Sequence, residues 1–210
     1  MTYVLLILFT ITFFYLAIAN RLDSIINLLV FQGILLFGMA FIELRELHVV
    51  NLVFILLETI VFKTIAIPVF LRYVIRKNNL TRESEPFLSN FVSLIIITLM
   101  IVIVTFIISN AIHDTHVKNI FFVVALSTLF TGLYLIVSRR MIITHVMGFL
   151  VIENGVFILT LAVGNEMPAL VNIGILLDIF VTALLLGIFV NKIGDVLKDM
   201  DVNKLRNLKD

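Results

Sequence analysis

Long apolar stretches alternate with polar connections along the whole chain. A helix needs about 20 predominantly apolar residues to span a bilayer. Stretches of about that length cover residues 3–19, 24–42, 49–71, 88–109, 119–137, 142–163 and 168–190. They are too long for the strands of a membrane barrel, which run about 9–11 residues with strict alternation. The pattern therefore predicts an all-α, polytopic membrane helix bundle of about seven transmembrane helices.

The polar connections suggest three regions. Residues 20–23 predict a tight turn, and residues 72–86 form the long polar insertion between the third and fourth helices. Pro68 predicts a kink near the end of the third helix. We expect an N-terminal four-helix region over 1–110, a three-helix region over 111–192 and a short cytoplasmic tail over 193–210.

Basic residues favour one side of the predicted bundle. Twelve of them fall on one side: Arg21, Arg72, Arg76, Lys77, Arg82, Arg139, Arg140, Lys192, Lys198, Lys204, Arg206 and Lys209. Two fall on the other, Arg45 and Lys118, and Lys63 lies within a span. Because cytoplasmic loops carry the excess of lysine and arginine, this bias predicts an N terminus outside and a C terminus in the cytoplasm. We expect a multi-pass protein of the cell inner (cytoplasmic) membrane.

Composition agrees with this class and narrows the chemistry. The chain is 61% hydrophobic, with a mean hydropathy of +1.19, whereas soluble domains are about 45–50% apolar. It contains no cysteine, which excludes thiolate-bound clusters and disulfides within it. The four histidines lack metal-site spacing, and there is neither a glycine-rich phosphate loop nor a nucleophile elbow. We expect no cofactor in this chain, and an enzyme is the least favoured class.

Four ionisable residues interrupt the apolar stretches near their middles: Glu58, Lys63, Glu153 and Asp178. A charge at the bilayer centre costs at least about 2.5–3.5 kcal/mol, so such residues normally face the bundle interior and mark ion or proton pathways. The predicted topology places all four in one layer near mid-membrane. With α-helical geometry, the side chains of Glu58 and Lys63 would point about 140° apart, so each would seek a partner on another helix.

Polar neighbours accompany these charges: Thr59, Asn154, Thr160 and Thr182. Thr59 precedes Lys63 by four residues and can share its face, as Thr182 can with Asp178. Gln32 and Asn27 are interpreted instead as hydrogen-bonding contacts between helices. A purely structural role is the alternative for the charged residues: they could form a buried ion pair, or the carboxylates could be protonated, and either arrangement would only fix helix packing.

Two segments carry a resemblance to known families. Residues 132–155 read GLYLIVSRRMIITHVMGFLVIENG, and residues 170–190 read LVNIGILLDIFVTALLLGIFV. Their double arginine, the glycine eight residues after Arg140, the asparagine at 154 and the carboxylate of Asp178 resemble the small three-helix K subunit of respiratory complex I. The full length, with its charged third helix LLETIVFKTIAIPVFLRYVIRK, resembles component E of hydrogenase-4.

The resemblance implies a non-catalytic membrane subunit of a complex I-like or formate hydrogenlyase-type assembly. Its partners would be antiporter-like membrane subunits and a hydrogenase-like redox module, with nickel–iron and iron–sulfur centres in those partners. Glu58, Lys63, Glu153 and Asp178 would form part of a lateral proton or sodium path. Two positions depart from the K-type pattern: its glutamate corresponds to Leu150, about one turn before Glu153, and its last-helix acid is aspartate here.

Two other functions stay open on the sequence alone. The chain could be a structural connector whose buried charges only fix helix packing. It could also be an independent small transporter, although no inverted repeat of broken helices is evident.

Overall fold

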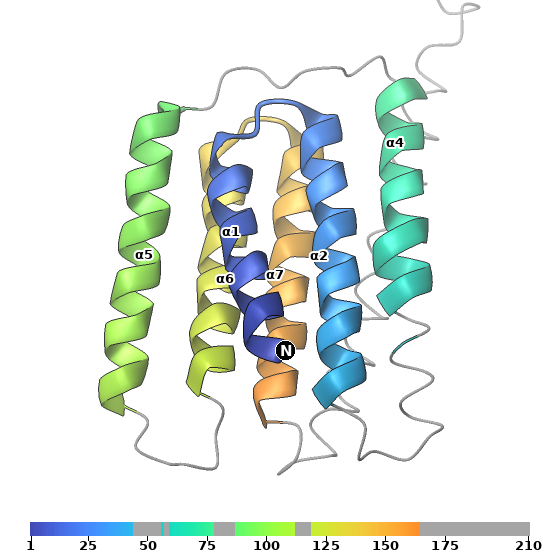
Figure 1. Ribbon diagram of the computed structural model, residues 1–210. Helices are drawn as coiled ribbons and strands as arrows, with labels where there is room; N and C mark the ends of the chain where they lie inside the picture. Colours follow the sequence, from blue (N-terminus) through green and yellow to red (C-terminus); the bar gives the residue numbers. More distant parts are fainter. Residues whose placement is uncertain (44–55, 57–58, 78–86, 112–118, 164–210) are drawn as a thin grey trace, which may run out of the picture. The chain divides into compact units, whose positions relative to one another are not determined.

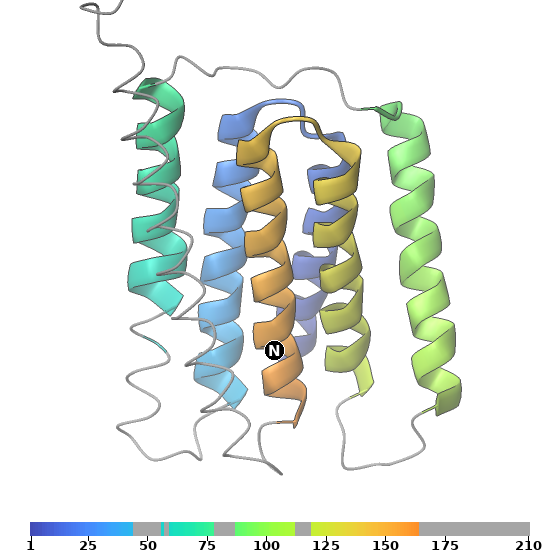
Figure 2. The ribbon, with the colours of Figure 1, turned by 180° about the vertical axis from the view of Figure 1, so that it is seen from behind.

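The computed structural model describes residues 1–43, 56, 59–77, 87–111 and 119–163. The chain divides into two compact units, 1–175 and 176–210, and every described residue belongs to the first. The described elements are helical, which confirms the all-α prediction for this part of the chain (Figures 1 and 2). They are α1 (Thr2–Ile18), α2 (Leu22–Glu43), the π-helical segment η1 (Thr59–Ala66), α4 (Ile67–Lys77), α5 (Asn90–Ala111), α6 (Asn119–Ser138) and α7 (Ile142–Val163).

Several of these helices can cross a membrane. Within the described ranges, α2, α5, α6 and α7 are long and apolar enough to do so, and α1 is a shorter apolar helix of 17 residues. The chain is therefore a multi-pass membrane protein, as predicted. The third predicted span, 49–71, is described only in part, and the seventh, 168–190, lies outside the described residues.

Helix α1 buries one face against its neighbours and exposes the other. It contacts α2, α5 and α6, and it buries Phe9, Phe13 and Leu16 completely. The Phe9 and Phe13 rings meet edge to face, with centroids 5.7 Å apart, a favoured aromatic geometry. The buried side chains of α1, α2, α6 and α7, with Ile97 of α5, form one hydrophobic core.

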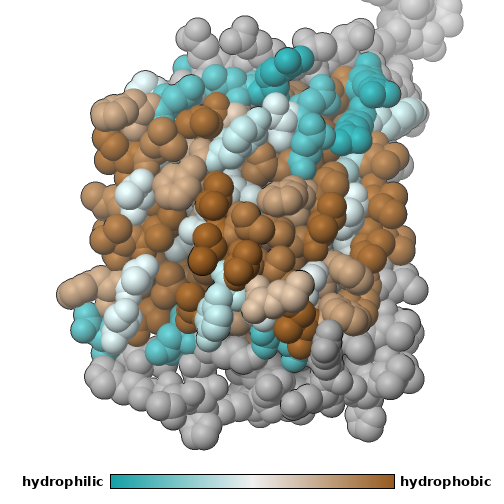
Figure 3. Space-filling model, viewed as in Figure 1, coloured by the Kyte–Doolittle hydropathy of each residue, from teal (hydrophilic) through white to brown (hydrophobic). Residues whose placement is uncertain are grey.

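Helix α5 is largely exposed. Among the described elements it packs chiefly against α1 and α6, and most of its apolar side chains are exposed, as with Leu99, Val102 and Phe106. A broad hydrophobic band covers the face in Figure 3, whereas hydrophilic residues gather at the end of the α1–α2 turn. An exposed apolar band of this extent suits contact with lipid.

Helices α6 and α7 form the closest pair because glycines line their contact. A Cβ built on Gly132 would lie 2.6 Å from the backbone oxygen of Gly148, and a Cβ on Gly148 would lie 2.9 Å from that of Gly132. Gly155 similarly faces the backbone of Leu129, at 3.0 Å. Small residues let helix backbones approach closely in membranes, where packing rather than the hydrophobic effect holds helices together.

Pro68 marks a change of helix type. The π-helical segment η1 ends at Ala66, and α4 begins at Ile67 with Pro68 as its second residue. Proline cannot donate the backbone hydrogen bond of a continuing helix, and its ring clashes with the carbonyl four residues back. The sequence predicted a kink here, and the structure places a junction between π- and α-helical geometry beside this proline.

The predicted polar insertion over 72–86 begins too early. Helix α4 continues to Lys77, so residues 72–77 are helical rather than part of a connection. The side chain of Arg72 donates a hydrogen bond to Asn27 Oδ1 of α2 at 2.6 Å, and the apolar face of α4 is buried beneath it. The charged residues had suggested a loop, but Arg72 and Arg76 belong to a helix, in which Arg72 is half-buried and Arg76 is exposed.

Basic residues gather at one end of the described helices, uppermost in Figure 1. The α1–α2 turn, the C-terminal half of α4 and the α6–α7 turn meet this end, and they contain Arg21, Arg72, Arg76, Lys77, Arg139 and Arg140. Arg139 is only 2% exposed; its guanidinium donates to the carbonyl oxygen of Ala19 at 2.9 Å and lies 3.4 Å from that of Ala17. It thereby caps α1. Arg140 is exposed, with its guanidinium 4.4 Å from the centre of the Phe87 ring.

Candidate functional site

A buried polar cluster crosses the interior where α1, α2, η1 and α7 meet. It comprises Thr12, Gln32, Lys63, Glu153 and Asn154, each 5% exposed or less. Glu153 and Asn154 lie near the middle of α7, and Gln32 lies near the middle of α2. Burying polar groups at such depth costs free energy unless they form hydrogen bonds with one another.

Three side-chain hydrogen bonds connect four of these residues in a line. Lys63 Nζ donates to Asn154 Oδ1 at 3.5 Å, and Asn154 Nδ2 donates to Gln32 Oε1 at 3.1 Å. Gln32 Nε2 donates to Thr12 Oγ1 at 2.7 Å. The Thr12 hydroxyl donates in turn to the backbone oxygen of Phe9 at 2.5 Å. We call this line the polar chain; it joins η1, α7, α2 and α1.

The Lys63 ammonium also faces an aromatic ring. Its Nζ lies 5.0 Å from the centre of the Phe157 ring, within the range of a cation–π interaction. Phe157 follows Glu153 by one turn of α7. The hydrogen bond from Lys63 to Asn154 is long, near the outer limit for such a bond. The ammonium thus lies between an amide oxygen and an aromatic face rather than in tight contact with either.

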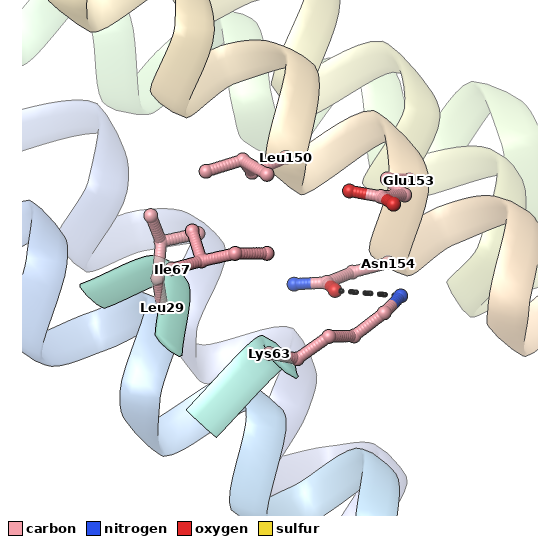
Figure 4. Close-up of a pocket in the computed structure, with 6 residues that line it drawn as sticks. All are labelled: Leu29, Lys63, Ile67, Leu150, Glu153 and Asn154. Carbon is pink, nitrogen blue, oxygen red and sulfur yellow. Dashed lines mark hydrogen bonds between the residues drawn. The ribbon is translucent and has the colours of Figure 1, made fainter. Parts of the chain in front are cut away.

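A small cavity brings Lys63 and Glu153 together. Its lining comprises Leu29, Lys63, Ile67, Leu150, Glu153 and Asn154 (Figure 4). Its volume is about 10 Å³, close to the least that holds one water molecule, and three of its lining residues are polar enough to bond a water. A cation, a carboxylate and an amide therefore share one space inside the bundle.

Local structure explains how Lys63 reaches this space. It belongs to the π-helical segment η1, a rare geometry that occurs often at functional sites. A Cβ built on Gly33 of α2 would lie 2.7 Å from Thr64 Oγ1 and 3.4 Å from the backbone carbon of Lys63. The missing side chain at Gly33 therefore lets η1 approach α2 closely. Thr64 Oγ1 donates to the backbone oxygen of Thr59, five residues back, at 3.1 Å.

The structure brings together part of the predicted site. Lys63, Glu153 and Asn154 line one cavity, and Thr59 is fully buried in η1. Thr160 is buried but donates to Val156 of its own helix at 2.9 Å. Glu58, Asp178 and Thr182 lie outside the described residues. The predicted divergence of Glu58 and Lys63 assumed α-helical geometry, whereas Thr59–Ala66 is π-helical.

Two further points concern α7 and α2. Leu150 and Glu153, about one turn apart, both line the cavity and so share one face of α7. Gln32 bonds to α1 and α7, which confirms its interpretation as a contact between helices.

Thr12 was not singled out from the sequence. Its only signal was a hydroxyl inside an apolar stretch, where most threonines, such as Thr10, bond to their own helix.

Metal chemistry has no visible support in the described ranges. They hold no group of three or more histidine, aspartate or glutamate side chains that could bind a metal ion. Of these groups, the Lys63 ammonium can give up a proton and the Glu153 carboxylate can accept one or bind a small cation, and the cavity between them is close to the least size that holds a water molecule.

Comparison with known proteins gives partial similarities. Hydrogenase-4 component E of Escherichia coli is 34% identical over 86 residues, which is 41% of this chain and 40% of that protein, and the protein of the same name from Shigella flexneri matches equally. An uncharacterized protein of Mycobacterium tuberculosis is 24% identical over 86 residues, 39% of its length. The matches thus span about two fifths of these relatives. No family model and no solved structure matches the chain.

Proposed function

We propose that the chain is a membrane subunit of a hydrogenase-type, complex I-like assembly, and that Lys63 and Glu153 help to move protons or sodium ions within it. The observation that carries this proposal is the cavity shared by Lys63, Glu153 and Asn154 in the bundle interior. The partial similarity to hydrogenase-4 component E supports the choice of assembly. Redox chemistry would belong to partner subunits, together with any nickel–iron and iron–sulfur centres.

The proton step can be written with the groups at hand. The Lys63 ammonium releases a proton to a water in the cavity, and that water passes a proton to the Glu153 carboxylate. This leaves a neutral amine and a neutral carboxylic acid. The next proton to reach Lys63 restores the ammonium, and Glu153 passes its proton to the next group of the path, which restores the carboxylate. A weakly polar interior favours such neutralisation, because each buried charge carries a large desolvation cost. Small changes in a partner subunit could therefore shift the balance between the two states.

The direction of the path is the second part of the proposal. Lys63 and Glu153 come from different elements, η1 and α7, and they lie far from both ends of α7. A path through them would run sideways, between neighbouring subunits, rather than straight across the membrane. Glu58 and Asp178 are proposed to continue it, because their sequence positions predict the same depth.

The test uses the complete assembly in its native membrane. Glu153→Gln and Lys63→Met remove the charges with little change of size, and ion movement is followed in inside-out vesicles driven by the redox substrate of the complex. We expect ion movement per assembled complex to fall at least tenfold. Exposed Asp23 and Arg76 provide the controls, Asp23→Asn and Arg76→Gln, which should transport normally. Unchanged transport in both cavity variants would overturn the proposed role.

A structural connector is the second candidate function. The specific observation in its favour is that Asn154 and Phe157 already hold the Lys63 ammonium, as they would for a charge with a packing role alone. In that case the same variants should lower the abundance of the complex while transport per complex stays normal. Quantifying assembled complex and transport in the same vesicles separates the two functions.

Partners can be identified directly. Purification of the intact assembly from native membranes should recover antiporter-like membrane subunits and a hydrogenase-like redox module with this chain. The chain reconstituted alone in liposomes should move no ions. Transport by the isolated chain would instead identify it as an independent transporter and contradict its role as a subunit.

A further inference from the structure

The hydrogen bonds of the polar chain all run in one direction. Starting at Lys63, each residue donates to the next one: to Asn154, then to Gln32, then to Thr12, and last to the backbone oxygen of Phe9. All four side chains are buried, so water from outside does not compete for these bonds. A line of aligned bonds polarises its members cooperatively.

Both ends of the line impose this direction. A lysine ammonium can only donate, so the atom that faces it must be an acceptor. An asparagine side chain offers an acceptor on one side and donors on the other; when its oxygen faces Lys63, its NH₂ group must find an acceptor, and Gln32 Oε1 provides one. At the other end, the Thr12 hydroxyl uses its single hydrogen on Phe9 and presents a lone pair to Gln32 Nε2.

We propose that Thr12 and Gln32 are positioning residues that orient the Asn154 amide so that its oxygen faces Lys63. This inference rests on the proposed function, because it assigns to residues of α1 and α2 the control of a group in the ion path. Thr12 reaches Lys63 only through Gln32 and Asn154. Without the acceptor at Thr12, the amide of Gln32 loses the partner that fixes its orientation, and Asn154 can then turn its NH₂ group toward the ammonium, where two donors repel.

The experiment replaces the threonine with its isosteric apolar counterpart. Thr12→Val, in the complete assembly, should lower ion movement per assembled complex by about three- to tenfold, the size expected for the loss of one buried hydrogen bond. Thr12→Ser keeps the hydroxyl and should restore transport to near the wild-type rate. Thr10 offers a matched control on the same helix, because its hydroxyl bonds only to Leu6 of α1; Thr10→Val should transport normally.

A double variant tests whether Thr12 acts through Asn154. Asn154→Ala removes the amide that Thr12 is proposed to orient, so adding Thr12→Val to it should cause no further loss of transport. Independent sites would instead give additive losses. If Thr12→Val assembles poorly, Thr12→Ala provides the same test with a smaller side chain. Additive losses, or wild-type transport in both Thr12 variants, would overturn the positioning role.

The outcomes also separate this inference from the proposed function. Loss of transport in Lys63→Met with normal transport in Thr12→Val would overturn the positioning role alone. Normal transport in Lys63→Met and Glu153→Gln would overturn both.

Discussion

Asn154 of α7 donates a hydrogen bond to Gln32 of α2 at 3.1 Å, between residues 122 positions apart in the sequence. This bond joins two membrane-length helices through their buried faces, directly beside the cavity that contains Lys63 and Glu153. Interhelical hydrogen bonds of buried amides both hold membrane helices together and fix their rotation. The contact therefore couples the stability of the bundle to the geometry of the candidate site.

Breaking this contact from one side should destabilise the protein. Gln32→Leu leaves the Asn154 amide without its acceptor, and we expect the free energy of unfolding to fall by roughly 1–2 kcal/mol. The measurement is the thermal stability of the detergent-solubilised protein. Each single variant leaves the amide of the other residue without its partner, whereas the double variant removes both amides. The double variant Gln32→Leu with Asn154→Leu should therefore lose less stability than the sum of the two single changes. Additive losses would show that the two amides do not depend on each other.

The glycine contact between α6 and α7 gives a second prediction. Gly132→Ala places a Cβ 2.6 Å from the backbone oxygen of Gly148, so the helices must separate, at a cost of about 1–3 kcal/mol. Gly38→Ala is the matched control, because its Cβ would meet only the tip of the Leu5 side chain, at 3.2 Å. Thermal stability measured on both variants should fall clearly for the first and little for the second. Equal behaviour would contradict the close approach of α6 and α7.

Arg139 should matter for stability, in contrast to its neighbour. Arg139→Met removes the donors that bond the carbonyl oxygens at the end of α1, and unpaired buried carbonyls cost about 1–3 kcal/mol. We expect lower thermal stability and less folded protein in the membrane. Arg140→Gln changes an exposed side chain and should leave both quantities near wild type. Equal losses in the two variants would mean that the pair acts only through its charge.

The sequence allowed the helices to be predicted more fully than their mutual arrangement. Apolar length located α2, α5, α6 and α7 closely, because crossing a bilayer demands about 20 apolar residues. It could not indicate which faces meet, since helices that are apolar on all sides carry no amphipathic signal. The pairing of Gln32 with Asn154 was therefore beyond prediction, although both residues stood out as polar groups in apolar stretches.

Helix α4 was predicted only in part. Its arginines suggested a loop, yet Ile67, Leu71, Val74 and Ile75 are buried at helical spacing, a period visible in the sequence. The π-helical geometry of η1 had only an indirect signal in Pro68. That proline forbids a regular continuation of the helix but does not specify which irregular form replaces it.

The orientation of the chain in the membrane can be tested because the sequence contains no cysteine. Single cysteines introduced at Arg140 and Glu43 would mark opposite ends of the described helices, since α7 begins beside the first and α2 ends at the second. The excess of basic residues predicts that the Arg140 end faces the cytoplasm. A membrane-impermeant maleimide applied to intact cells should label Glu43→Cys alone, and permeabilised cells should be labelled at both positions. Leu99→Cys, exposed on the apolar surface of α5, should stay unlabelled, and the reverse pattern would invert the topology.

A positive charge at position 63 should not be sufficient for ion movement. Lys63→Arg keeps a positive charge, but the planar guanidinium is larger than an ammonium and carries five donors. The cavity beside it measures about 10 Å³, close to the least that holds one water molecule, so the larger group would press against Glu153 and Asn154. Because arginine also holds its proton under all protein conditions, it cannot release one to the carboxylate.

We therefore expect Lys63→Arg to lose ion movement nearly as fully as Lys63→Met, while the assembled complex stays more abundant than with methionine. Transport and complex abundance are measured on the same inside-out vesicles. Arg76→Lys, on the exposed face of α4, is the control for exchanging one basic side chain for the other and should transport normally. Wild-type transport in Lys63→Arg would mean that a fixed positive charge at this position is sufficient, and that proton release from Lys63 is not part of the path.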